Sequence, residues 1–154
     1  MKKSTPESYA AEVKRNVRKH GFHLTYVAAN DAPAYCYSTG IFETFGIPEL
    51  FISSLPPAMS GDLVHSYVKR FKNSIRPIGE RIKKRSTDPF DYYLINVDSA
   101  KIRDYVLASL RYYGSASLEY LQLVFPDADM RYPHEPGYDY DQELLGDYSA
   151  ITTA

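Results

Sequence analysis

Residues 32–56 read APAYCYSTGIFETFGIPELFISSLP. Two runs, AYCYSTGI (34–41) and ELFISSL (49–55), are rich in aromatic and aliphatic residues, and the short link FETFGIP between them contains glycine and proline. Runs of this kind, bounded by turn residues, are typical of strands. Strands joined by so short a link pair in the antiparallel sense, because a parallel pair needs a long crossover. We therefore predict an antiparallel strand pair here.

Hydrophobic periodicity predicts the remaining elements on either side of this pair. Alternating or continuous apolar runs predict further strands, and apolar residues three or four positions apart predict helices. The predicted strands cover residues 22–27, 34–41, 49–55, 92–97 and 117–125, and the helices run from 5 to 20, from about Ser60 to Pro77 and from Asp98 to Gly114. This order predicts an α+β fold: a mainly antiparallel sheet of about five strands, with three helices on one face.

The chain of 154 residues fits a single domain. We expect a core over residues 5–125 and an irregular, acidic, tyrosine-rich tail over 126–154, with a short helix near 141–146. The tail carries one arginine against seven carboxylates, whereas the first 125 residues carry 17 basic against 12 acidic side chains. No apolar run could span a bilayer and the N-terminus lacks a secretory signal, so we expect a cytoplasmic protein without a membrane partner.

Residues suited to catalysis are few. Cys36, the single cysteine, lies within a predicted strand beside the small residues Ala34 and Ser38, so we expect a buried, unreactive thiol rather than a nucleophile. No His, Cys, Asp or Glu cluster has metal-ligand spacing, and no glycine-rich phosphate loop is present. We therefore expect no catalytic residue, no metal and no cofactor.

A basic segment covers residues 69–85, with eight lysines and arginines against one glutamate. Such a segment could follow a phosphate backbone, and binding would then depend on salt. A solvated helix face followed by a polar loop has the same composition, and the chain as a whole is slightly acidic. We therefore do not expect nucleic acid as the partner.

The tail combines tyrosines with a dense negative charge. Tyrosines supply contact area and carboxylates attract a basic surface, so the tail suits docking onto a basic protein. The predicted partner-binding residues are Tyr132, Tyr138, Asp139, Tyr140 and Asp141. The alternative is that the tail folds back onto its own domain and neutralises residues 69–85.

Three stretches carry a family resemblance: HGFHLTYV (20–27), PAYCYSTGIFETFGIPELFISSLP (33–56) and LQLVFPDADMRYPHEPGYD (121–139). In this order and spacing, they resemble the bacterial proteins of domain of unknown function family 4262, over about residues 18–140. The matching positions include Tyr37, Gly40, Gly46, Pro48, Glu49, Gln122, Pro126 and Asp127. The chain departs from the family pattern at Ile47, where histidine is common, and at Phe125, where tryptophan or tyrosine is usual.

Some proteins of this family are encoded beside secreted antibacterial toxins. The resemblance therefore implies a non-enzymatic immunity protein that binds and occludes a cognate toxin. The acidic tail would mimic an anionic substrate, which points to an ADP-ribosyltransferase or another nucleotide-acting toxin. Two alternatives stay open: a small enzyme or ligand-binding protein with a site between residues 37–48 and 122–127, and a nucleic-acid-binding adaptor acting through residues 69–85. The sequence does not indicate the oligomeric state.

Overall fold

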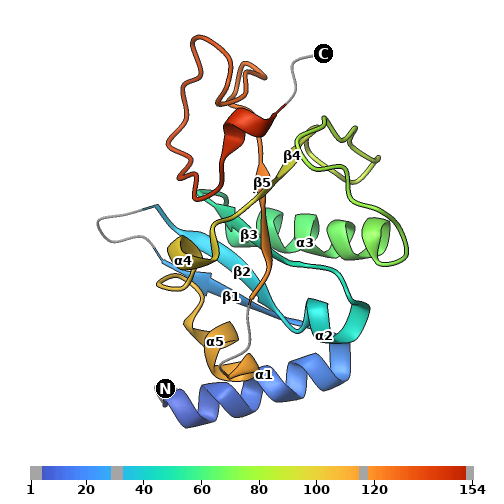
Figure 1. Cartoon of the computed structure of the whole chain (residues 1–154), viewed down its shortest axis with the longest axis vertical. Helices are drawn as coiled ribbons and strands as arrows, with labels where there is room; N and C mark the ends of the chain where they lie inside the picture. Colours follow the sequence, from blue (N-terminus) through green and yellow to red (C-terminus); the bar gives the residue numbers. More distant parts are fainter. Residues whose placement is uncertain (1–4, 29–32, 115–117, 152–154) are drawn as a thin grey trace.

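A computed structural model describes residues 5–28, 33–114 and 118–151 of the chain (Figure 1). These residues have the predicted α+β composition. In chain order the elements are α1 (Pro6–His20), β1 (His23–Val27), β2 (Tyr35–Thr39), α2 (Ile41–Phe45), β3 (Glu49–Ser53), α3 (Pro57–Phe71), β4 (Tyr93–Asn96), α4 (Ser99–Ile102), α5 (Leu107–Tyr113), β5 (Tyr120–Val124) and the 3₁₀ helix η1 (Tyr148–Ala150). The three longer helices are α1, α3 and α5, and α2 and α4 are short.

The strands form one mixed sheet in the order β1-β2-β3-β5-β4. The pairs β1–β2 and β2–β3 are antiparallel, as predicted. The pair β4–β5 is also antiparallel, whereas β3 and β5 are parallel, with Leu50 opposite Leu121. A parallel pair needs a long crossover. The chain between Ser53 and Tyr120, which includes α3, β4, α4 and α5, supplies it. The short links therefore determine the pairing direction of the first three strands only.

Both faces of the sheet are covered, and the expectation of helices on one face is wrong (Figure 1). On one face α3 packs in a cluster with Leu50 and Leu121. On the opposite face α4 and α5 pack with Tyr37 and Phe51, and α1 lies beside α5. All five residues of β3 are buried. A strand that is buried on both faces requires cover on both, which explains the difference.

The predicted helix from Asp98 to Gly114 is two helices, α4 and α5, separated by a turn. Two tyrosines of β2 satisfy the backbone groups that this break exposes. The Tyr35 hydroxyl donates to the Tyr105 carbonyl oxygen at 2.9 Å, and the Tyr37 hydroxyl accepts the Ala108 N–H at 3.0 Å. The break is therefore stabilised by contacts that the local sequence does not reveal.

Two other helix predictions differ from the structure. Helix α3 begins at Pro57 rather than Ser60, since proline suits the first helical position, and it ends before Pro77. Residues 141–146 form no helix. Gly146 instead pairs with Val97 as an isolated bridge at the edge of the sheet.

One buried carboxylate fixes the connection between β2 and β3. Glu49, at the start of β3, is 1% exposed. Its two oxygen atoms accept hydrogen bonds from the backbone N–H groups of Gly40, Ile41 and Phe42 and from the hydroxyls of Ser38 and Tyr113. The carboxylate thus supplies acceptors for the N–H groups at the start of α2, which no earlier turn of helix can satisfy.

Gly40 is required at this connection for two reasons. Its φ of +100° is a conformation that favours glycine, and a Cβ atom there would lie 2.7 Å from Cγ2 of Val17 on α1. The connection between β2 and β3 therefore also sets how closely α1 approaches the sheet.

We expect Glu49→Gln to lower the free energy of unfolding by about 3 kcal/mol. The Nε2 atom of glutamine cannot accept an N–H group, so at least one buried donor loses its partner. Urea denaturation measures the loss. Glu43→Gln is the matched control, because Glu43 is exposed on α2 and accepts one hydrogen bond, from the Tyr112 hydroxyl, which glutamine can also accept. Equal losses in the two variants would contradict the role of Glu49.

Candidate functional site

Gln122 ties the tail to the centre of the sheet. This side chain on β5 is fully buried. Its Nε2 atom donates to the Glu143 carbonyl oxygen at 2.7 Å, and its Oε1 atom accepts the N–H groups of Leu145 at 2.8 Å and Gly146 at 3.2 Å. The tail therefore folds back over the face of the sheet that carries Gln122.

Asp127, which follows β5 closely, organises the first half of the tail. Its carboxylate accepts the backbone N–H groups of Asp129 at 3.0 Å, Arg131 at 2.9 Å and Asp139 at 2.9 Å. The Arg131 guanidinium lies 3.3 Å from the same carboxylate and 2.8 Å from that of Asp129. These bonds close residues 127–139 into a loop with a fixed conformation.

The other residues singled out by the resemblance also act within the fold. Gly46 ends α2 with a φ of +72°. The Pro48 carbonyl oxygen accepts the Tyr67 hydroxyl at 2.8 Å, which joins the start of β3 to α3. Pro126, two residues after the end of β5, is buried.

One alternative placed a ligand site between residues 37–48 and 122–127. Near these segments Tyr35, Tyr37, Phe51, Tyr105 and Leu145 pack together on one face of the sheet. Gln122 is bonded to the tail, whereas Tyr37 also lines the pocket between α1 and α5 described below.

The five predicted partner-binding residues differ in exposure. Tyr132 is fully buried: its hydroxyl donates to the Asp91 carbonyl oxygen at 2.7 Å, and the Arg81 guanidinium lies 5.0 Å from the centre of its ring. Tyr138 is half-buried, and its hydroxyl accepts from Nε2 of Gln142 at 2.6 Å. Tyr132 therefore stabilises the docked tail and offers no surface to a partner.

Asp139, Tyr140 and Asp141 are exposed and consecutive, and we call them the acidic segment. The Tyr140 side chain is 44% exposed although its hydroxyl donates to the Ser54 carbonyl oxygen at 2.6 Å. The Ser54 hydroxyl in turn donates to the Asp141 carbonyl oxygen at 2.7 Å. The acidic segment is thus held in place by backbone and hydroxyl contacts, while its two carboxylates face solvent.

The tail folds back on its domain, but an aromatic ring rather than a carboxylate makes its contact with the basic segment. Arg81 forms its ion pair with Asp91 of the core, at 3.1 Å, and lies over the Tyr132 ring. The ion pairs of the tail that the structure describes are those of Arg131 with Asp127 and Asp129. The charges of the acidic segment therefore stay available.

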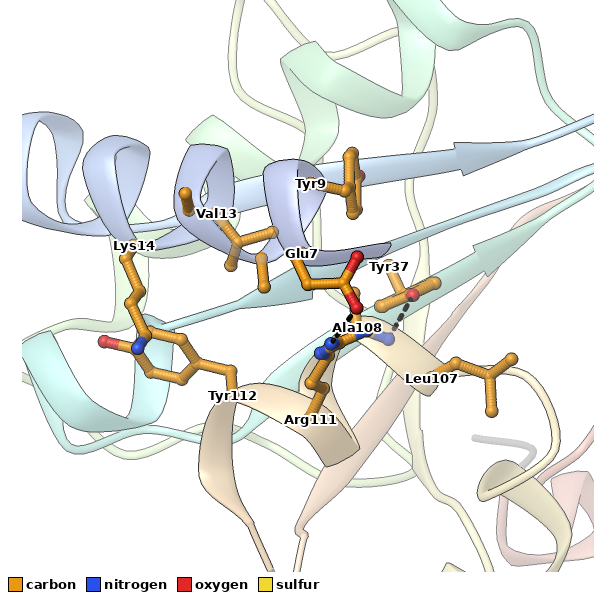
Figure 2. A pocket seen from close by; sticks show the side chains of 11 residues that line it. Glu7, Tyr9, Val13, Lys14, Tyr37, Leu107, Ala108, Arg111 and Tyr112 are labelled. Carbon is orange, nitrogen blue, oxygen red and sulfur yellow. Dashed lines mark hydrogen bonds and ion pairs between the residues drawn. The ribbon is translucent and has the colours of Figure 1, made fainter. Parts of the chain in front are cut away.

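A pocket that the sequence analysis did not predict lies between α1 and α5 (Figure 2). Its volume is about 760 Å³. The apolar part of the lining comes from Tyr9, Ala10 and Val13 of α1, Leu107 and Ala108 of α5, and Tyr37 of β2. Alanines on two separate helices give no periodic or motif signal, so sequence reasoning had no means of finding this pocket.

Hydrogen bonds attach α1 to the sheet below this pocket. The Tyr9 hydroxyl lies 2.7 Å from Nε2 of His23 and 2.8 Å from Oγ1 of Thr25. Nδ2 of Asn16 lies 2.8 Å from Nδ1 of His23. Because an amide nitrogen only donates, Nδ1 of His23 accepts the hydrogen bond from Asn16. The proton of neutral His23 is therefore on Nε2, which donates a hydrogen bond to the Tyr9 oxygen.

Cys36 is buried, as predicted. It lies opposite Ile52 on the face that α3 covers, and burial raises the pKa of its thiol to about 12. A thiol with so high a pKa is not a nucleophile at neutral pH. Burial also raises the pKa of the Glu49 carboxyl group, against the hydrogen bonds that lower it.

Within residues 5–28, 33–114 and 118–151, no three His, Cys, Asp or Glu side chains gather as a metal site. No helix in the same ranges is both long and apolar enough to cross a bilayer.

A family model described as Domain of unknown function (DUF4262) matches residues 16–139. The match includes Glu49, Gln122 and Asp127, the three buried acceptors described above. It begins after residues 7–14, the part of α1 that lines the pocket. No curated protein and no solved structure matches the chain.

The buried His23 predicts a pH dependence of stability. Burial lowers its pKa below the usual 6.5, so the unfolded chain binds a proton at a higher pH than the folded protein does. The free energy of unfolding should therefore fall as the pH is lowered from 6.5 to the pKa of the folded state, with no further loss from this group below it.

His23→Gln should remove this contribution, because glutamine can accept from Asn16 and donate to Tyr9 without titrating. Urea denaturation between about pH 7.5 and about pH 5 measures the slope. The exposed His20 gives the matched control, and His20→Gln should keep the slope of the natural protein. A slope that is unchanged in His23→Gln would contradict the assignment.

Proposed function

The chain belongs to the DUF4262 family, and from this premise we propose that it is a non-enzymatic immunity protein. It binds a cognate antibacterial toxin and occludes a basic cleft of that toxin. The observation that carries the proposal is the acidic segment, Asp139–Asp141, which is exposed and already held in one conformation.

The acidic segment has the physical properties of a binding anchor. Tyr140 presents a large ring whose hydroxyl is already fixed on Ser54, so binding orders few additional groups. Tyrosine is enriched among the residues that dominate binding energy. The carboxylates of Asp139 and Asp141 attract a basic surface over distance, which accelerates association at low salt.

The charge of the tail favours a partner with a cleft for anionic substrates. The tail carries one arginine against seven carboxylates, and the carboxylates of Asp129, Asp139, Asp141 and Asp147 belong to exposed residues. A toxin that binds a dinucleotide or RNA needs a basic cleft for the phosphates. We therefore propose an ADP-ribosyltransferase or another nucleotide-acting toxin as the partner class.

Three polar residues within the family match use their side-chain oxygen atoms in hydrogen bonds inside the protein, which supports a role without catalysis. Glu49, Gln122 and Asp127 each accept backbone N–H groups of their own chain. A general acid or base needs a lone pair or proton directed at a substrate. In these three residues the acceptor atoms instead point at backbone N–H groups of the same chain.

Reversing the charge of the acidic segment tests the proposal. Co-expression with the product of the neighbouring gene, tested as the cognate toxin, should give a stoichiometric complex and rescue of the cells. Asp139→Lys combined with Asp141→Lys should weaken the complex by about 100-fold and abolish rescue. Titration calorimetry on the purified proteins measures the affinity.

Asp62→Lys combined with Asp104→Lys is the matched control, because both carboxylates are exposed and lie on other parts of the molecule. This control should retain affinity and rescue. If the natural protein forms no complex and gives no rescue, the immunity function is wrong. If the complex tolerates reversal of the acidic segment, the function stands and the binding surface is wrong.

A further inference from the structure

The pocket between α1 and α5 has walls that are fixed before any ligand arrives. The Tyr9 hydroxyl holds α1 against His23 and Thr25 of β1. On the opposite wall, the Ser109 hydroxyl of α5 lies 2.5 Å from that of Thr39 and 2.6 Å from that of Tyr120. Both helices are thus attached to the sheet by side-chain hydrogen bonds, which oppose a movement that would close the space between them.

Small side chains leave this space open. Ala10 on α1 and Ala108 on α5 line the pocket, and Leu107 at its edge is 67% exposed. The volume of about 760 Å³ lies within the range of pockets that hold small molecules. A pocket that is apolar, fixed and open leaves apolar surface in contact with water, which an apolar ligand body would cover.

The rim of the pocket carries more positive than negative charge. Glu7, Lys14 and Arg111 surround it, with Lys14 beside Tyr112 at one end in Figure 2. The Arg111 guanidinium lies 3.9 Å from the Glu7 carboxylate, a long and exposed contact that contributes little. Within the described part of the chain Lys14 has neither an ion pair nor a side-chain hydrogen bond. Donors therefore remain available for one anionic group.

We propose that this pocket binds a small organic carboxylate with an apolar or aromatic body. The body lies between Ala10 and Ala108, and Arg111 holds the carboxylate at the rim, with Lys14 adding positive charge at the end beside Tyr112. Helices α1 and α5, which form the pocket, lie at the opposite end of the molecule from the tail (Figure 1), so the proposal does not depend on the immunity function.

Calorimetric titration of the full chain with octanoate, 1-octanol and octylammonium separates the apolar contribution from the charge. Octanoate should bind at one site at least about tenfold more tightly than 1-octanol, and octylammonium should bind more weakly than either. 4-Phenylbutanoate tests the aromatic body and should bind at the same site.

Arg111→Gln should remove most of the preference for octanoate over 1-octanol, and Lys14→Gln should reduce it. Arg103→Gln is the matched control, since Arg103 is exposed and does not line the pocket. Ala108→Trp should abolish binding by filling the space, whereas Ala100→Trp, at an exposed position of α4, should not. Circular dichroism checks that each variant is folded. If Ala108→Trp does not fold, Arg111→Gln and Lys14→Gln still test the proposal.

Equal affinity for octanoate and 1-octanol would overturn the proposal, as would an octanoate affinity that Arg111→Gln leaves unchanged. Failure of both carboxylates to bind at millimolar concentration would also overturn it. Light scattering provides the remaining check: a dimer that Ala108→Trp dissociates would assign the pocket to a second copy of the chain instead of a small molecule.

Discussion

Buried side-chain oxygen atoms that accept backbone N–H groups are the interaction on which the rest of this structure depends. Glu49 accepts backbone N–H groups at the start of α2, and Gln122 accepts those near the end of the tail. Asp127 accepts those of the first loop of the tail. An N–H group left unpaired in the interior costs about 1–3 kcal/mol. Irregular segments can therefore pack against the sheet because two strand residues, and Asp127 beyond the end of β5, provide these acceptors.

This constraint connects the fold to function. The three acceptors lie within the residues that match the family model, yet none directs its acceptor atoms outward. Two of them instead support segments that reach the surface. Asp127 bonds the backbone of Asp139 in the acidic segment, and Glu49 accepts the hydroxyl of Tyr113 at the end of α5, the helix that forms one wall of the pocket. Function on this account belongs to the surfaces that the buried groups position.

Sequence patterns predicted those helix ends and strand pairs that depend on residues close together in the chain. Helix α1 has nearly the predicted bounds of 5 and 20, with Thr5 and Gly21 as its caps, and short links set the antiparallel pairs of the first three strands. The parallel pairing of β3 with β5 and the break between α4 and α5 depend on distant partners, which periodicity does not show. A charged residue in the buried run ELFIS was a signal for the role of Glu49, whereas the alanines of the pocket gave none.

Amide hydrogen exchange on the free protein tests most directly whether buried acceptors hold the tail in place. The N–H groups of Asp139, Leu145 and Gly146, which bond to Asp127 and Gln122, should exchange orders of magnitude more slowly than in an unstructured chain. They should approach the protection of Leu50 in β3. Exchange at the rate of an unstructured chain would contradict the account and would mean that the acidic segment becomes ordered only when a partner binds.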